Sequence, residues 1–140
     1  MAKITYKGPI TKHIVGNTNI LVFGSNTEGR HGKGTAFLAL REFGAKYGQP
    51  KGLQGQSYGI VTKNLKKTVH PSISKELIIE QIKNLYLFAS DRPDLKFYIP
   101  YMDGDNNLNS YSSKELAEMF NCEEAPENII FEESFLKLFE

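Results

Sequence analysis

The stretch NILVFGSNTEGRHGKGTA, residues 19–36, decides the fold of this chain. Residues 20–23 form a continuous apolar run, which predicts a central strand that is buried on both faces. A polar, glycine-rich loop follows, and from Thr35 onward the pattern is helical. The apolar residues on one face of this predicted helix are Ala36, Ala39, Leu40 and Phe43. The stretch therefore predicts a strand, a glycine loop and a helix, in that order.

The rest of the chain repeats this alternation. The further predicted strands are residues 57–62, 96–99 and 128–131. One predicted helix begins after Ser74, which can cap it, and another begins at a capping box formed by Ser112 and Glu115. The apolar stripe of the first of these helices consists of Ile78, Ile82, Leu85 and Ala89, and Leu77 and Phe88 widen it. Because strands that alternate with helices need crossover connections, we predict an α/β fold. It is a three-layer α/β/α sandwich with a mixed, largely parallel central sheet and a ligand site at the carboxyl ends of the strands.

Composition limits the architecture and the function classes. The chain has 140 residues and contains no repeat, linker or low-complexity tract, so we predict a single domain over residues 1–140. Leu, Ile, Val and Phe account for 38 residues, enough apolar surface to exclude wholesale disorder. The formal net charge of +1 gives no general field for collecting nucleic acid. Any binding of phosphate must then come from local geometry.

Several further features indicate a cytoplasmic protein without a membrane partner. The apolar runs fall far short of the roughly 20 residues of a spanning helix, and the N-terminal segment has no apolar signal region. Cys122 is the only cysteine, which excludes an internal disulfide and indicates a small buried apolar group. His13, His31 and His70 lack the spacing of metal ligands, so we expect no metal site.

The glycine-rich loop is the densest chemical feature. Between a buried strand and a helix N-terminus, its backbone N–H groups can bind an anion, and its glycines let a phosphate come close. The loop is not a Walker A loop, since Thr27 takes the place of the first glycine and Gly34 that of the metal-binding hydroxyl. It is not a dinucleotide fingerprint either, since Phe37 takes the place of the third glycine. A purely structural turn remains the alternative interpretation.

The spacing of the loop resembles that of a known family. Asn26, Gly29, Gly32, Gly34 and Ala36 follow the strand in the pattern of the first ligand loop of macrodomains, which are α/β/α modules that bind ADP-ribose. The run from residue 31 to residue 36, HGKGTA, is similar to that of the branch containing the terminal ADP-ribose protein glycohydrolase and the antitoxin that removes ADP-ribose from DNA. The resemblance extends over residues 15–135 in the order of elements.

The resemblance implies roles for particular residues. Thr62-Lys63 matches a Thr-Lys pair whose lysine is catalytic in that branch, and Asp103 and Asp105 are the candidates for a catalytic aspartate in the second loop. The implied ligand-binding residues are Ser25, Asn26, Gly29, His31, Gly32, Lys33, Gly34, Thr62 and Gly104. Asn26 can hydrogen-bond ribose hydroxyls at the strand edge, and the alternative is a plain turn-forming Asn. The segment 100–111 differs from the family's second loop because it contains only one glycine.

Lys63 also has an interpretation from first principles. A lysine at the carboxyl end of a strand, opposite a loop of backbone donors, can contact a phosphate or attack the anomeric carbon of a ribose. The alternative is a solvated lysine at the start of the basic turn 63–67. Our first hypothesis is therefore a protein that binds ADP-ribose and hydrolyses an ADP-ribosyl linkage. The second is a binder of ADP-ribose or a related NAD-derived nucleotide without catalysis, and the third is an interaction module.

These hypotheses also define the partners that we expect. The partner is ADP-ribose itself or an ADP-ribosylated substrate, which could be a modified nucleic acid or protein. No cofactor is implied, and no metal is required for the hydrolysis that the resemblance suggests.

Overall fold

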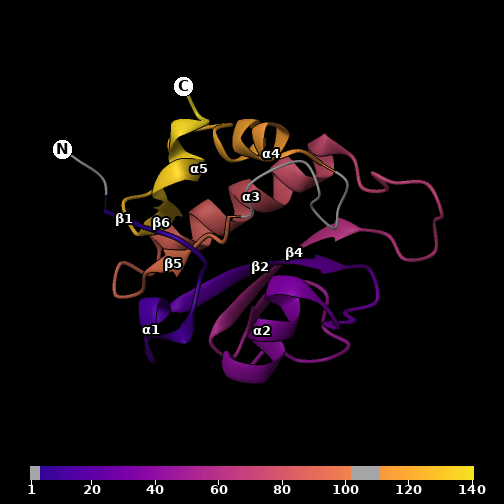
Figure 1. Cartoon of the computed structure of the whole chain (residues 1–140), viewed down its shortest axis with the longest axis horizontal. Coiled ribbons are helices and arrows are strands. Elements are labelled where there is room, and N and C mark those ends of the chain that lie inside the picture. Colours follow the sequence, from indigo (N-terminus) through magenta and orange to yellow (C-terminus); the bar gives the residue numbers. More distant parts are fainter. Residues whose placement is uncertain (1–3, 102–110) are drawn as a thin grey trace.

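The computed structural model describes residues 4–101 and 111–140 (Figure 1). The helices and strands, in chain order, are β1 (Thr5–Tyr6), α1 (Lys12–Val15), β2 (Ile20–Asn26), α2 (Gly34–Glu42), β3 (Gly52–Gln54), β4 (Ser57–Lys63), α3 (Lys75–Ser90), β5 (Phe97–Tyr98), α4 (Ser113–Phe120), β6 (Ile129–Glu132) and α5 (Glu133–Lys137). The strands form one sheet in the order β1-β6-β5-β2-β4-β3, and only the β3–β4 pair is antiparallel. The prediction of an α/β fold with a mixed, mostly parallel sheet flanked by helices is confirmed.

Four of these strands, β2, β4, β5 and β6, were predicted from the sequence. The strands β1 and β3 and the short helices α1 and α5 were not predicted. Each has at most five residues, so the hydrophobic pattern within it is too short to show a period. Among the described residues, no helix combines the length and the apolar character that a membrane span requires.

The sheet separates two hydrophobic clusters. Ile20 and Val22 of β2 belong to the cluster that packs under α3, α4 and α5, whereas Leu21 and Phe23 belong to the cluster under α1 and α2. Figure 1 shows these two groups of helices on opposite sides of the sheet. Because successive side chains of a strand point to opposite faces, β2 is buried on both, as its continuous apolar run predicts.

Both predicted helix caps are present. The Ser74 hydroxyl accepts a hydrogen bond from the backbone N–H of Leu77, and Ser112 and Glu115 form a complete capping box at the start of α4. The predicted apolar stripe of α3 is buried; its members are Ile78, Ile82, Leu85 and Ala89. Leu77 itself is 52% exposed because it lines an open groove beside the edge of β4 rather than the core.

Among the strands of residues 4–101 and 111–140, none pairs with the outer side of the carboxyl half of β4, because β3 pairs only with Ser57 to Gly59. The side-chain amide of Gln81 in α3 takes the place of a strand there. Its Oε1 accepts from the N–H of Val61 at 2.7 Å, and its Nε2 donates to the carbonyl of Val61 at 2.8 Å. This pairing satisfies the free edge of β4. It also fixes the strand end beside which the candidate site lies.

Candidate functional site

A cavity of about 140 Å³ opens at the carboxyl ends of β2, β4 and β5, beside the N-terminus of α2. The strands β4 and β5 lie on either side of β2, and the helices that follow β2 and β4 cover opposite faces of the sheet (Figure 1). The strand order therefore reverses beside β2. Ligands of open α/β sheets bind at such reversal points, outside the carboxyl ends of the strands.

The N-terminus of α2 forms one wall of this cavity. Lys33, Gly34, Thr35 and Ala36 all line it. Lys33 occupies the N-cap position, but its side chain makes no capping hydrogen bond. Within residues 4–101 and 111–140, the backbone N–H groups of residues 34–36 have no hydrogen-bond partner. This wall therefore presents uncompensated donors and the positive end of the helix dipole.

The opposite wall is apolar and comes from distant parts of the chain. Its residues are Val22, Ile60, Ile78, Ile99, Leu116 and Phe120. They belong to three strands and to the helices α3 and α4, or directly follow them. The cavity thus combines polar backbone groups at one end with an apolar surface at the other. Such a surface suits a ligand that carries both an anionic group and an uncharged, largely apolar part.

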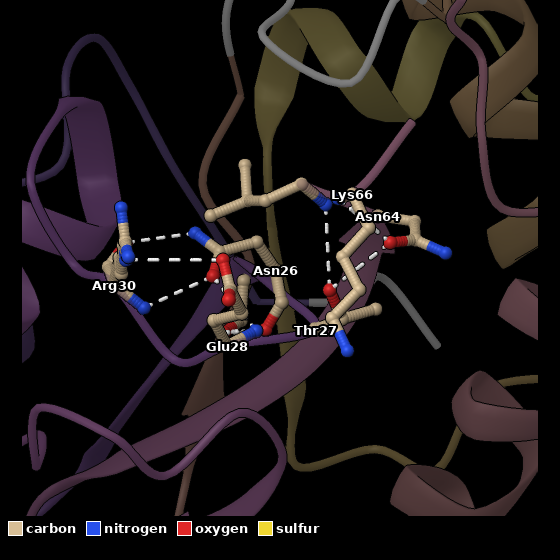
Figure 2. A network of polar contacts seen from close by, with 8 residues as sticks. Asn26, Thr27, Glu28, Arg30, Asn64 and Lys66 are labelled. Carbon is tan, nitrogen blue, oxygen red and sulfur yellow. Dashed lines mark hydrogen bonds and ion pairs between the residues drawn. The ribbon is translucent and has the colours of Figure 1, made fainter. Parts of the chain in front are cut away.

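The side chain of Asn26 organises the loop that leads from β2 to α2. Its Nδ2 donates to the carbonyl of Arg30 at 2.7 Å, and its Oδ1 accepts from the N–H groups of Glu28 and Arg30 at 3.2 and 2.9 Å. An ion pair of 3.8 Å joins Arg30 to Glu28 (Figure 2). The sequence favours Asn26 as a ribose ligand, but in this structure its amide is used within the loop.

Thr27 ties the loop after β2 to the loop after β4. Its backbone N–H donates to the carbonyl of Lys63 at 3.0 Å, and its hydroxyl accepts from the N–H of Leu65 at 3.3 Å. The same hydroxyl donates to Oδ1 of Asn64 at 3.4 Å (Figure 2). The two strand ends that border the cavity are therefore linked by side-chain and backbone hydrogen bonds.

Two glycines of the loop have different surroundings. Gly29 has a φ of +67°, and a Cβ there would lie 2.6 Å from backbone atoms of Gly48 and Gln49. Its carbonyl also accepts from the N–H of Gly48 at 2.8 Å. Gly32, in contrast, has no atom within 4 Å of the position of an added Cβ. Gly29 is thus required by the packing of the protein itself, whereas Gly32 faces open space next to α2.

His31 and Ser25, both predicted ligand contacts, lie in the interior. His31 is fully buried and does not line the cavity. Its Nε2 lies 3.3 Å from Oε1 of Gln54, and its ring meets the ring of Phe23 edge-on at 5.0 Å. Since the oxygen of Gln54 also accepts from the N–H of Lys46, Nε2 of His31 acts as the donor. Ser25 is buried too, and its carbonyl accepts from the hydroxyl of Thr62 at 3.3 Å.

Thr62 and Lys63 are adjacent at the end of β4 but lie in different environments. The pairing of β2 with β4 shifts register after Ser25, so that Asn26 lies opposite Lys63 and Thr62 is the extra residue. Thr62 lines the cavity, whereas Lys63 does not. The Lys63 side chain is half-exposed and forms no ion pair with any carboxylate of the described ranges. Asp103, Gly104 and Asp105 lie outside the described residues.

Sequence reasoning missed the apolar wall and the Gln81 amide. The wall joins residues as distant as Val22 and Phe120, so it depends on the tertiary fold. Only the capping box before α4 gave a usable signal, because it fixes where that helix begins. Gln81 falls beside the predicted apolar stripe, and nothing in its sequence context indicates an edge strand.

Cys122, the lone thiol, does not belong to the site. It is half-buried, and burial raises its pKa, with the charge of Glu123 adding to the rise. The thiolate is therefore disfavoured at neutral pH, which agrees with its interpretation as an apolar group rather than a nucleophile. Over the described ranges, no group of three or more His, Cys, Asp and Glu side chains is placed to hold a metal ion.

Comparison with known proteins adds no relative to this description. No protein-family model matches the chain, and neither a curated protein nor a solved structure matches it. Function is therefore inferred from the geometry of the site and from the loop motif.

Proposed function

We propose that this protein binds ADP-ribose, or a closely related NAD-derived nucleotide, in the cavity beside α2. The observation that carries the proposal is the composition of the cavity walls: the uncapped N-terminus of α2 on one side and an apolar surface on the other. The resemblance of the loop motif to macrodomains supplies the chemical identity of the ligand.

In this proposal the pyrophosphate binds at the N-terminus of α2. The N–H groups of residues 34–36 have no partner in the described ranges, and they point from a helix terminus that carries partial positive charge. Anions bind at such termini because the donors and the dipole act together. The side chain of Lys33 is exposed next to them and adds a full positive charge. Gly32 presents no side chain, so a phosphate can approach the backbone there.

In this proposal the rest of the nucleotide contacts the apolar wall and Thr62. The apolar wall offers Ile99, Leu116 and Phe120 for contact with a base or with a ribose face. The Thr62 hydroxyl lines the cavity and can turn from the Ser25 carbonyl, at 3.3 Å, toward a ligand oxygen. A volume of about 140 Å³ holds only part of a dinucleotide-sized ligand. The remainder would then lie over the mouth, close to the exposed loop residues.

A second candidate function is hydrolysis of an ADP-ribosyl linkage. The position of Lys63 favours this function, because Lys63 ends β4 opposite Asn26, the last residue of β2. Its side chain is half-exposed and forms no ion pair with the described carboxylates. Binding ranks first because Lys63 does not line the cavity. In the hydrolytic scheme Lys63 acts with Asp103 or Asp105. A third possibility, an interaction module whose glycine loop only shapes the fold, predicts no nucleotide binding at all.

Calorimetric titration of the full chain with ADP-ribose, ATP and NAD tests the proposal. We expect saturable binding of ADP-ribose that is at least about tenfold tighter than binding of ATP, a difference of roughly 1.4 kcal/mol. A preference for ATP would contradict the assignment. Absence of binding, together with an unchanged melting temperature at millimolar ADP-ribose, would favour the interaction module.

Comparison of Lys63→Ala with Lys66→Ala separates the two nucleotide functions. If the protein is a hydrolase, Lys63→Ala abolishes release of ADP-ribose from a modified substrate while its affinity for ADP-ribose stays within about tenfold of wild type. Lys66, three residues further along, is exposed and serves as the matched control. A pure binder shows no turnover in either variant or in the wild type.

A further inference from the structure

The charges of this chain are strongly separated along the sequence. Residues 1–75 contain 12 of the 17 Lys and Arg but only two of the 16 Asp and Glu, whereas residues 76–140 contain the other five and 14. The formal net charge of +1 conceals this separation. The first part builds β1, α1, β2, α2, β3 and β4, and the second builds β5, β6 and nearly all of the helices α3 to α5 (Figure 1). We call residues 1–75 the basic half of the sequence and residues 76–140 the acidic half.

The basic residues concentrate in three loops. Segments 27–33, 46–51 and 63–67 together carry one acidic residue, Glu28, and seven basic ones. The basic residues are Arg30, Lys33, Lys46, Lys51, Lys63, Lys66 and Lys67. All are exposed except Lys63, which is half-exposed. We call these three segments the basic loop surface.

Direct contacts hold the three loops side by side. The first and third are joined by the hydrogen bond from the N–H of Thr27 to the carbonyl of Lys63. The first and second are joined by the hydrogen bond from Gly48 to Gly29 and by the close approach of Gly29 to the backbone at 48–49. Thr27 and Lys51 also line one open groove beside β4. The seven cations therefore share one region of the surface.

These cations are largely uncompensated. The only ion pair within the basic loop surface joins Arg30 to Glu28 at 3.8 Å, and both side chains are more than one third exposed. Glu80 of α3 lines the same groove as Lys51 without forming an ion pair with it. Apart from Arg30, the cations of this surface have no carboxylate partner in the described part of the chain. Their field thus extends into solvent.

An aromatic side chain lies among these cations. Tyr47 is 65% exposed and is flanked in the second loop by Lys46 and Lys51. Proteins that bind single-stranded nucleic acid combine a basic track for the phosphates with exposed aromatic rings on which bases stack. An acidic peptide would use the charges but would have no need of the ring.

We propose that the basic loop surface binds single-stranded nucleic acid, with phosphates on Lys51, Lys66 and Lys67 and a base stacked on Tyr47. Of the residues of this surface, only Lys33 lines the cavity. The proposal does not depend on ADP-ribose binding, because the probe is an unmodified oligonucleotide.

Fluorescence anisotropy with a labelled oligothymidine of about 12 nucleotides tests this proposal on the full chain. We expect binding at about 50 mM salt that weakens by at least about tenfold near 200 mM, because several phosphates release counterions. The charge-reversed variant Lys51→Glu/Lys66→Glu/Lys67→Glu should lose at least about tenfold in affinity. Tyr47→Ala should lose about threefold or more, and Tyr47→Phe should bind as wild type does.

The matched control reverses the same number of charges in the acidic half. Lys83, Lys96 and Lys137 are exposed there and outside any described ion pair, so their triple change to Glu should leave affinity within about twofold of wild type. Circular dichroism shows whether each variant is folded. The single variant Lys67→Glu replaces the test triple variant if that one is unfolded, and Lys83→Glu replaces the control triple variant in the same case. No binding at low salt, equal loss in test and control variants, or tighter binding to polyglutamate or phosphatidylserine vesicles would overturn the proposal.

Discussion

The first turns of helices α2 and α4 both line the cavity. Only the N-terminus of α4 is capped by side chains of the protein. At α4, the hydroxyl of Ser112 accepts from the N–H of Glu115, and the carboxylate of Glu115 accepts from the N–H of Ser112. At α2, Lys33 stands in the N-cap position without a side-chain cap. We call the uncapped N-terminus of α2 the open terminus and the capped N-terminus of α4 the closed terminus. An uncapped N-terminus is less stable than a capped one, and under the proposed function the pyrophosphate of the ligand binds at the open terminus.

The largest effect is expected on the free energy of unfolding when Gly29, in the loop before the open terminus, is replaced. Gly29→Val should lower the free energy of unfolding by about 3 kcal/mol or more, because the new Cβ would meet backbone atoms at 2.6 Å and the φ of +67° suits only glycine well. Urea denaturation measures the change. The control is Gly32→Ala, which has open space around the added Cβ and should cost less than about 1 kcal/mol. Equal losses in both variants would mean that Gly29 does not support the loop as described.

The next largest effect is expected on the affinity for ADP-ribose when Gly32, beside the open terminus, is replaced. Gly32→Asp places a carboxylate beside the free N–H groups of α2, where it competes with a bound pyrophosphate. We expect affinity for ADP-ribose to fall by at least about tenfold, roughly 1.4 kcal/mol, with the free energy of unfolding nearly unchanged. Calorimetry on Gly32→Asp and Gly32→Ala separates charge from size. If both bind as wild type does, the ligand does not contact this terminus.

A smaller effect is expected at the closed terminus. Ser112→Ala removes the side-chain acceptor of the capping box and should lower the free energy of unfolding by about 1 kcal/mol. Because the box already occupies these donors, affinity for ADP-ribose should stay within about twofold of wild type. Urea denaturation and calorimetry on the same variant measure the two quantities. A large loss of affinity with no loss of stability would reverse the assigned roles of the two helices.

The smallest effect is a pH dependence at α4. The hydrogen bond from the backbone of Ser112, together with Lys75, holds the pKa of Glu115 below its ordinary value. A depressed folded-state pKa stabilises the protein above the unfolded-state pKa, and this stabilisation is lost as the pH falls through the folded-state value. The stability difference between wild type and Glu115→Gln should therefore shrink between about pH 7 and about pH 3 in urea denaturation. A difference that is constant with pH would contradict the capping role of the carboxylate.

The sequence predicted the elements whose signal is local. The apolar run of β2, the apolar stripe of α3 and the capping box of Ser112 and Glu115 each lie within a few residues, and the structure contains all three. The two-residue β1 is different, because it is a strand only through its pairing with β6. Its own residues do not specify that partner.

The site was predictable only in its position. The loop composition and the alternation of strands and helices predict a ligand site at the carboxyl end of β2, where the structure has a cavity. The contacts that each loop residue makes were not predictable, because the contacting residues come from distant parts of the sequence. His31 is buried against Gln54, and Gly29 packs against residues 48–49. Asn26 is the exception: its partners lie within four residues, so an Asn-organised turn was visible in principle.

The sharpest test of ligand binding at the open terminus of α2 is NMR of the ¹⁵N-labelled protein during titration with ADP-ribose. We expect the largest amide shifts at residues 32–36, while those of Ser113 and Glu115 at the start of α4 move much less. Shifts that gather elsewhere and leave residues 32–36 unmoved would contradict this expectation.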